Sequence, residues 1–199
     1  MDTGNVFFLE KLKLRTPDAQ DAAPLNELLT QSPPLDNNSV HCNLLQCTHF
    51  AATSVAAVIN DRLVGFISGY RLPHQPDTLF IWQVVVDKAL RGGGVAKRML
   101  RWLIDQPACK TITGLSTTIT AGNGASWALF ESFARESNLV PQRSLIFKSE
   151  DYFAGERADE YLLHIYPLPN RSKKSAGDHL RELKGASVRF MPSIKRNVE

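Results

Sequence analysis

Residues 78–86 restrict the possible folds of this chain more than any other part of its sequence. They read Thr-Leu-Phe-Ile-Trp-Gln-Val-Val-Val, so both alternating positions are mainly apolar. A strand with this pattern is typical of the middle of a sheet that is buried on both sides. Three glycines, Gly92, Gly93 and Gly94, come next, and an amphipathic helix pattern begins near Val95. A central strand, a glycine loop and a helix in succession indicate an α/β domain.

Further strand and helix patterns surround this segment. Periodicity and turn residues predict strands at 11–15, 54–59, 63–70, 111–120, 143–149 and 160–166, and helices after residues 18, 39, 94 and 122. This order predicts an α/β fold with a central mixed, twisted sheet flanked by helices. We expect one domain over residues 1–169.

Charge separates this domain from the end of the chain. The 199 residues carry 23 Lys and Arg against 20 Asp and Glu, a net charge of +3. Residues 1–169 contain 15 basic and 17 acidic side chains, whereas residues 170–199 contain 8 and 3. We predict a basic, poorly ordered tail over residues 170–199. Nucleic-acid binding is not expected, because the charge is modest and Phe190 is the tail's one aromatic residue.

The composition and the cysteines bear on where the protein works. With 43% hydrophobic and 22% charged residues, the chain resembles a soluble domain rather than a disordered, collagen-like or membrane-spanning one. Its first residues lack the pattern of a secretory signal. Cys42, Cys47 and Cys109 lack metal-ligand spacing and are interpreted as buried thiols. We therefore expect a cytoplasmic protein with no metal and no membrane contact.

Three interpretations of the glycine loop are open from the residues alone. Glycines let the backbone approach a ligand, and the start of the following helix favours a phosphate or pyrophosphate. The loop lacks the Gly-x-x-x-x-Gly-Lys-Ser/Thr spacing of a Walker loop. A dinucleotide-binding loop would follow the first strand, whereas this one follows the fourth. A flexible turn without a ligand is the third interpretation.

The surrounding residues resemble a known superfamily. Arg91-x-x-Gly94-x-Ala96 is similar to motif A of the GCN5-related N-acetyltransferases (GNAT), and Asn123-x-x-Ser126-x-x-Leu129-Phe130 is similar to their motif B. The resemblance implies a GNAT-type acyl-CoA N-acyltransferase fold, with acetyl-CoA bound where the central strand splays from its parallel neighbour. The cofactor-binding residues that it implies are Val84, Val85 and Val86 at the pantetheine arm, Arg91, Gly92, Gly93, Gly94, Val95 and Ala96 at the pyrophosphate, and Asn123, Ser126 and Phe130 toward the thioester.

A narrower resemblance covers almost the whole predicted domain. Residues 32–39, 65–70, 79–83, 117–120 and 125–130 together resemble the diaminobutyrate acetyltransferase family of ectoine biosynthesis. That family transfers acetyl from acetyl-CoA to the side-chain amine of L-2,4-diaminobutyrate, giving the precursor of an osmoprotectant. The resemblance also implies a homodimer.

The candidate acceptor site combines acidic, aromatic and hydroxyl residues. The resemblance places Asp36, His41, Trp82, Thr118 and Glu160 at the diamino acid, with Glu160 and Asp36 as candidate catalytic residues. Each also has a plain structural interpretation. Asp36 would be a turn residue, His41 a half-buried histidine and Trp82 a core aromatic. Thr118 would be an ordinary strand residue and Glu160 an acid at the end of a strand. His41 stands where relatives often have Tyr.

The expected chemistry is direct attack by a neutral amine on the thioester in a ternary complex. The amine, whose ordinary pKa is about 10, must first lose a proton, and a carboxylate can take it. Many GNAT enzymes protonate the leaving thiolate with a Tyr on motif B, where this chain has Phe130. Alternative functions are a GNAT enzyme for another diamine or amino acid, and a non-catalytic acyl-CoA sensor.

Overall fold

The computed structural model describes residues 10–33, 38–136 and 138–168. Asp36 and the predicted tail at 170–199 lie outside the described residues.

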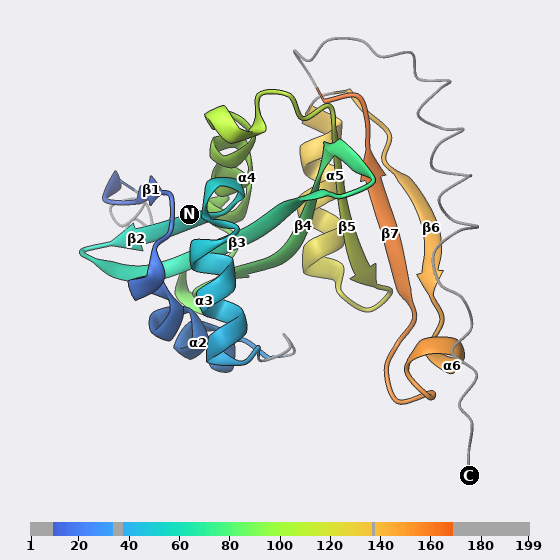
Figure 1. The fold of residues 1–199 in the computed structure, drawn as a ribbon, viewed down its shortest axis with the longest axis horizontal. Helices are drawn as coiled ribbons and strands as arrows, with labels where there is room; N and C mark the ends of the chain where they lie inside the picture. Colours follow the sequence, from blue (N-terminus) through green and yellow to red (C-terminus); the bar gives the residue numbers. More distant parts are fainter. Residues whose placement is uncertain (1–9, 34–37, 137, 169–199) are drawn as a thin grey trace.

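One mixed sheet forms the centre of the domain, with its strands in the order β1-β2-β3-β4-β5-β7-β6 (Figure 1). All neighbouring strands are antiparallel except β4 and β5, which run parallel. The predicted mixed sheet is therefore confirmed. The strands are β1 (Lys13–Arg15), β2 (Val55–Ile59), β3 (Arg62–Leu72), β4 (Gln75–Val86), β5 (Gly114–Thr120), β6 (Gln142–Phe147) and β7 (Glu160–Ile165).

Helices cover the sheet on both faces. One hydrophobic cluster joins α4 and α5 to one face, and a second joins α2 and α3 to the other. We call these the α4/α5 face and the α2/α3 face. The α-helices are α2 (Ala22–Thr30), α3 (Val40–Thr48), α4 (Val95–Ile104), α5 (Gly124–Glu136) and α6 (Ser149–Tyr152), and the 3-10 turns are η1 (Ala19–Asp21), η2 (Ala51–Thr53), η3 (Lys88–Leu90) and η4 (Pro107–Cys109).

Local sequence signals explain where the helices begin. The hydroxyl of Ser39 accepts a 3.1 Å hydrogen bond from the backbone N–H of Cys42, which caps α3. Asp18 and Asp21 form a capping box before α2, so the predicted helix begins with the 3-10 turn η1. Buried side chains at helical spacing hold α4 on the sheet: Val95, Met99, Leu100, Leu103 and Ile104.

The expectation that residues 78–86 are buried on both sides is wrong for part of this strand. The side chain of Trp82 is 45% exposed. Phe80, Gln83 and Val84 are half-buried. The pattern predicted the central position of β4 correctly, but helices do not cover the α2/α3 face evenly along the strand. The exposed part of this face is where the candidate acceptor residues lie.

Candidate active site

The two parallel strands separate partway along their length. Among the described residues, β4 and β5 pair from Thr78 with Gly114 to Ile81 with Thr117. Beyond that point β4 pairs with β3, and β5 pairs with β7. The backbone N–H and C=O groups of alternate residues in 82–86 therefore face the opening instead of a neighbouring strand. Val84, Val85 and Val86, predicted to bind a pantetheine arm, all lie in this stretch.

A β-bulge lies where the splay begins. Ser68 of β3 is opposite Gln83 and Gly69 is opposite Ile81, so Trp82 is one extra residue in β4. The side chains confirm the shift. Ile81 packs in the cluster under α4 and α5, yet Val85 packs in the cluster under α2 and α3. The bulge thus turns two consecutive side chains, Trp82 and Gln83, toward the α2/α3 face.

The glycine loop has the geometry of an anion site. Gly92 and Gly94 have φ values of 78° and 77°, in the left-handed region that glycine adopts without strain. Gly94 is the N-cap of α4 and supplies no side chain, so the first N–H groups of α4 have no partner within the helix. A Cβ added at either glycine would meet nothing within 4 Å, so the loop is open to a ligand. Together with the helix dipole, this favours a phosphate group.

Asn123 directly precedes α5, Ser126 lies in its first turn and Phe130 lies in its middle. Oδ1 of Asn123 accepts a 3.1 Å hydrogen bond from the N–H of Ser126 and so caps the helix. The ring of Phe130 is 1% exposed and belongs to the core under α4 and α5. The structure thus gives two of these residues a structural role, and their contact with a thioester stays a prediction.

Three of the predicted acceptor residues share one face of the sheet. Thr118 is opposite Leu162 and Glu160 is opposite Thr120, both at positions that alternate with the core residue Ile119. Thr118 and Glu160 therefore face away from α4 and α5, as Trp82 does. Both side chains are half-buried. The structure brings a carboxylate, a hydroxyl and an indole to the same face near the splay.

Aromatic side chains support Trp82 on this face. Its ring makes edge contacts with Phe50 at 6.2 Å and with Tyr70 at 6.3 Å between centroids. Tyr70 also packs against Phe80 at 5.3 Å. Burial raises the pKa of the Tyr70 hydroxyl, so it stays protonated at neutral pH. These contacts fix the indole as a wall whose exposed surface is available to a cation.

The residues near Asp36 are tied to this face. Nδ2 of Asn38 donates a 2.8 Å hydrogen bond to Oε1 of Gln83, next to Trp82. Asn38, the first described residue after 34–37, therefore lies beside β4. His41 lies in the first turn of α3 and is exposed, and its substrate contact stays a prediction.

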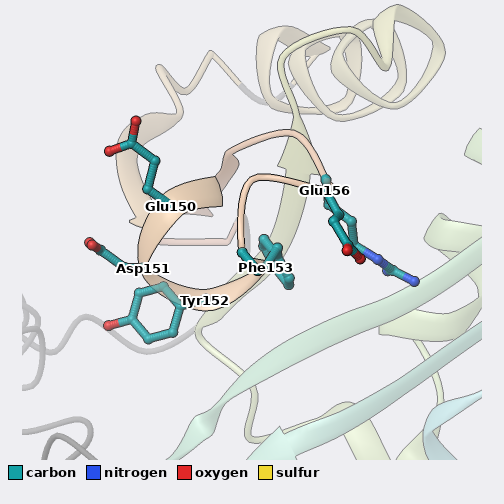
Figure 2. Close-up of a pocket in the computed structure, with 7 residues that line it drawn as sticks. Glu150, Asp151, Tyr152, Phe153 and Glu156 are labelled. Carbon is teal, nitrogen blue, oxygen red and sulfur yellow. The ribbon is translucent and has the colours of Figure 1, made fainter.

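The connection between β6 and β7 adds an acidic loop next to Glu160. Figure 2 shows Glu150, Asp151 and Tyr152 pointing outward from α6, around a shallow pocket that the predicted site residues do not line. Oδ1 of Asp159 accepts a 2.7 Å hydrogen bond from the N–H of Ser149. Asp159 therefore holds this loop, whereas its neighbour Glu160 begins β7 on the α2/α3 face.

The part of the chain that the structure describes also bears on metal binding and on membrane insertion. There, no group of three or more His, Cys, Asp or Glu side chains is arranged to hold a metal ion. Within the same residues, no helix is both long and apolar enough to span a bilayer.

Comparison with known proteins agrees with this geometry. The model of the Acetyltransferase (GNAT) family matches residues 22–134. An L-2,4-diaminobutyric acid acetyltransferase of Methylotuvimicrobium alcaliphilum is 45% identical over 79% of this chain and 91% of its own length. The enzyme of the same name from Vibrio cholerae is 43% identical over 76% of this chain and 87% of its own. This chain belongs to the L-2,4-diaminobutyric acid acetyltransferases of the GNAT family.

Solved structures support the same assignment of this acetyltransferase. The diaminobutyrate acetyltransferase of Paenibacillus lautus, solved with L-2,4-diaminobutyric acid and coenzyme A, superposes with a TM-score of 0.77. It is 35% identical and the match covers 81% of this chain and 98% of that one. The ribosomal-protein-S18-alanine N-acetyltransferase of Escherichia coli, at 14% identity and a TM-score of 0.63, shares the fold. The predicted GNAT fold is confirmed, and the protein is an acetyl-CoA-dependent N-acetyltransferase.

Two polar contacts of this diaminobutyrate acetyltransferase were not predicted from the sequence. They are the bond from Asn38 to Gln83 and a bond from Arg91 to Ser32. Gln83 could have been found, because it is a lone amide within an apolar strand. Ser32 carries no such signal, since it resembles any serine at the end of a helix.

Proposed function

We propose that this enzyme transfers the acetyl group of acetyl-CoA to the 4-amino group of L-2,4-diaminobutyrate. The products are N4-acetyl-L-2,4-diaminobutyrate and CoA, and the reaction is a step of ectoine biosynthesis. The observation that carries the proposal is the match to the Paenibacillus lautus structure, which holds both the diamino acid and coenzyme A. The relative that is 45% identical carries the same name.

The glycine loop and the splayed part of β4 fit acetyl-CoA. The N–H groups at residues 92–96 would hold the pyrophosphate, with charge added by Arg91. The backbone of Val84, Val85 and Val86 would hydrogen-bond the pantetheine arm in place of a neighbouring strand. This arrangement puts the thioester at the splay, next to the face that carries Trp82 and Glu160.

The α2/α3 face fits the diamino acid. Its two ammonium groups need anions, which Glu160 and Asp36 would supply, and the indole of Trp82 offers a further surface for a cation. Thr118 would donate a hydroxyl, and His41 at the start of α3 would complete the binding site. Residues 1–169 carry more acidic than basic side chains, which suits a cationic acceptor.

The reaction requires proton removal before bond formation. A carboxylate, Glu160 or Asp36 through water, would take a proton from the 4-ammonium group, and the amine would attack the thioester carbon. Backbone N–H groups near Val84 or Val85 would stabilise the negative oxygen. The new C–N bond then replaces the C–S bond, the attacking nitrogen loses a second proton to give the amide, and the CoA thiolate leaves. Because Phe130 has no proton to donate, another group or water protonates the thiolate, and the cysteines need form no acyl intermediate.

A panel of acceptors tests the function. Acetyl-CoA turnover is measured with diaminobutyrate, ornithine, lysine and spermidine, and NMR of the product locates the acetyl group. We expect a kcat/KM for diaminobutyrate about 10- to 200-fold above that for ornithine, since one extra methylene in a binding site costs about 1–3 kcal/mol, and further above the values for the longer amines. Equal rates would point to a broader amine acetyltransferase, and no turnover to an acyl-CoA sensor.

The assembly and location are also part of the proposal. We propose a cytoplasmic homodimer of the domain at 1–169, with the basic segment 170–199 as a tail. The family resemblance supports the dimer, and biosynthetic relatives support the location. Light scattering of the full chain, and of a chain that lacks residues 170–199, measures the molecular mass and therefore the oligomeric state.

A further inference from the structure

The guanidinium of Arg91 joins two segments that are far apart in the sequence. Its Nε donates a 3.0 Å hydrogen bond to the carbonyl of Val86, the last residue of β4. Its Nη2 donates a 3.0 Å hydrogen bond to the hydroxyl of Ser32. Arg91 itself directly precedes the glycine loop. One planar side chain thus connects the end of the central strand, the phosphate loop and the chain that follows α2.

Ser32 is a well-placed anchor for this bridge. Its residue is 2% exposed, although it lies just beyond a surface helix. Its own N–H donates a 2.8 Å hydrogen bond to the carbonyl of Leu29 in the last turn of α2. The position of Ser32 is therefore fixed by the helix on one side and by Arg91 on the other. In the sequence, Asp36 follows four residues later.

The downstream side of the same connection is also tied to β4. Asn38 reaches Gln83 on the strand whose last residue, Val86, receives the bond from Arg91. Ser32 and Asn38, which lie on either side of the undescribed residues 34–37, are thus both bonded to β4 or to the loop after it. A shift of the phosphate loop would pull on Ser32 through a bond with a charged donor, which is stronger than one between neutral groups.

We propose that Arg91 is a positioning residue that couples the acetyl-CoA loop, through Ser32 and the end of α2, to the α2/α3 face that carries the acceptor residues. This role rests on the proposed function and adds to the charge that Arg91 contributes near the pyrophosphate. Its planar fork matters, because two different nitrogens donate to two separate acceptors and a lysine ammonium cannot keep the same two bonds. The structure assigns Ser32 the matching role of receiving the bridge.

Three variants separate this role from simple phosphate binding. Arg91→Lys keeps the charge and loses the fork, Ser32→Ala loses the receiving hydroxyl, and the double variant loses both. Arg62→Gln is the matched control, because Arg62 forms an ion pair with Asp87 at the surface. For each variant the KM values of both substrates are measured, together with the dissociation constant of CoA by calorimetry.

We expect each single variant to raise the KM for diaminobutyrate by about 3- to 10-fold, which is less than the full effect of losing one hydrogen bond to a charged group because the bridge acts on the acceptor indirectly. The dissociation constant of CoA should change by less than about 2-fold in Ser32→Ala. The double variant should resemble the worse single variant, because both remove the same bridge. An unchanged KM for diaminobutyrate in Ser32→Ala, or fully additive effects, would overturn the proposal. A change in Arg91→Lys that is confined to the affinity for CoA would also overturn the proposal.

A second readout does not depend on the acceptor. Amide hydrogen exchange at Ser32 should be faster in Arg91→Lys than in the wild type and in Arg62→Gln. If the wild type does not acetylate diaminobutyrate but this exchange is faster, the proposed function fails and the bridge stands. Unchanged exchange at Ser32 would overturn the bridge itself.

Discussion

The side-chain amide of Asn38 donates a 2.8 Å hydrogen bond to Oε1 of Gln83, joining the start of α3 to the bulged part of β4. The bulge is what makes this bond possible, because it turns Gln83 toward the α2/α3 face beside Trp82. The acceptor face and the acetyl-CoA opening therefore meet at one short stretch of backbone.

The bond between Asn38 and Gln83 positions the acceptor segment. Gln83→Leu should lower kcat/KM for diaminobutyrate by about 2- to 13-fold, since a neutral hydrogen bond contributes about 0.5–1.5 kcal/mol. The KM for acetyl-CoA should stay within about 2-fold, because the backbone of β4 is retained. Steady-state kinetics with each substrate varied in turn measures both. Gln83→Glu keeps the acceptor atom and serves as the matched control; equal losses in both variants would contradict a hydrogen-bond role.

Trp82 is expected to act on the acceptor and not on acetyl-CoA. Trp82→Ala removes the exposed ring and should raise the KM for diaminobutyrate, with a loss of about 0.5–2 kcal/mol for a cation on an aromatic surface. Trp82→Phe keeps a smaller aromatic face and should lose less. The melting temperatures of the same variants measure how much the edge contacts with Phe50 and Tyr70 stabilise the fold. A raised KM for acetyl-CoA alone would place the indole elsewhere.

Glu160 and Asp36 carry the charge of the proposed site. Glu160→Gln and Asp36→Asn should each cost about 2–4 kcal/mol of transition-state stabilisation if they hold an ammonium away from bulk water. Glu156→Gln is the control, because Glu156 lines the pocket beside α6 (Figure 2). Rates are compared as kcat/KM across pH. Activity near that of the wild type in both variants would refute the acceptor site.

Gly94 should matter for acetyl-CoA because of its backbone conformation. Gly94→Ala places a Cβ on a residue with φ of 77°, which costs about 1–2 kcal/mol, although the Cβ itself meets nothing within 4 Å. We expect a raised KM for acetyl-CoA and a lower melting temperature. The control is Gly122→Ala, since a Cβ there also meets nothing within 4 Å and its φ is not positive. Identical behaviour of the two variants would show that the turn tolerates alanine.

Cysteine reactivity tests the packing under α3. Burial raises the pKa of the Cys47 thiol to about 12, and the charges of Asp21 and Asp18 act in the same direction. At pH 8 almost none of it is thiolate, so iodoacetamide should spare Cys47 in the folded protein and modify the partly exposed Cys42 first. Mass spectrometry of the peptides, with and without denaturant, compares the two. Rapid labelling of Cys47 in the native protein would contradict the packing.

The sequence predicted the fold well because its strongest signals are local. The strand at 78–86, the amphipathic α4 and the Ser39 cap depend on periodicity and on neighbouring residues, and all three were found. The short helix α6 was missed, since four residues give no period. The two-sided burial predicted for residues 78–86 was wrong at Trp82, because alternation assumes a regular strand and a bulge changes the alternation without changing the hydrophobicity pattern.

The sequence predicted which residues belong to the site, but not how they are arranged in space. Motif resemblance named Trp82, Thr118 and Glu160 separately, and their common face follows from pairing between β5 and β7 that the sequence does not encode locally. The roles of Asn38 and Arg91 depend on partners 45 and 59 residues away. Neither partner forms a motif with them, so only the folded chain reveals the contacts.

The single extra residue in β4 has a consequence for how this enzyme could change during evolution. Deleting that residue would restore a regular ladder with β3 and leave residues 83–86 on the faces that they occupy now, but it would remove the indole from the α2/α3 face. Gln83 would keep its position without an aromatic ring beside it. The bulge thus lets one strand present two neighbouring side chains to the acceptor, and a relative that is one residue shorter here would present one.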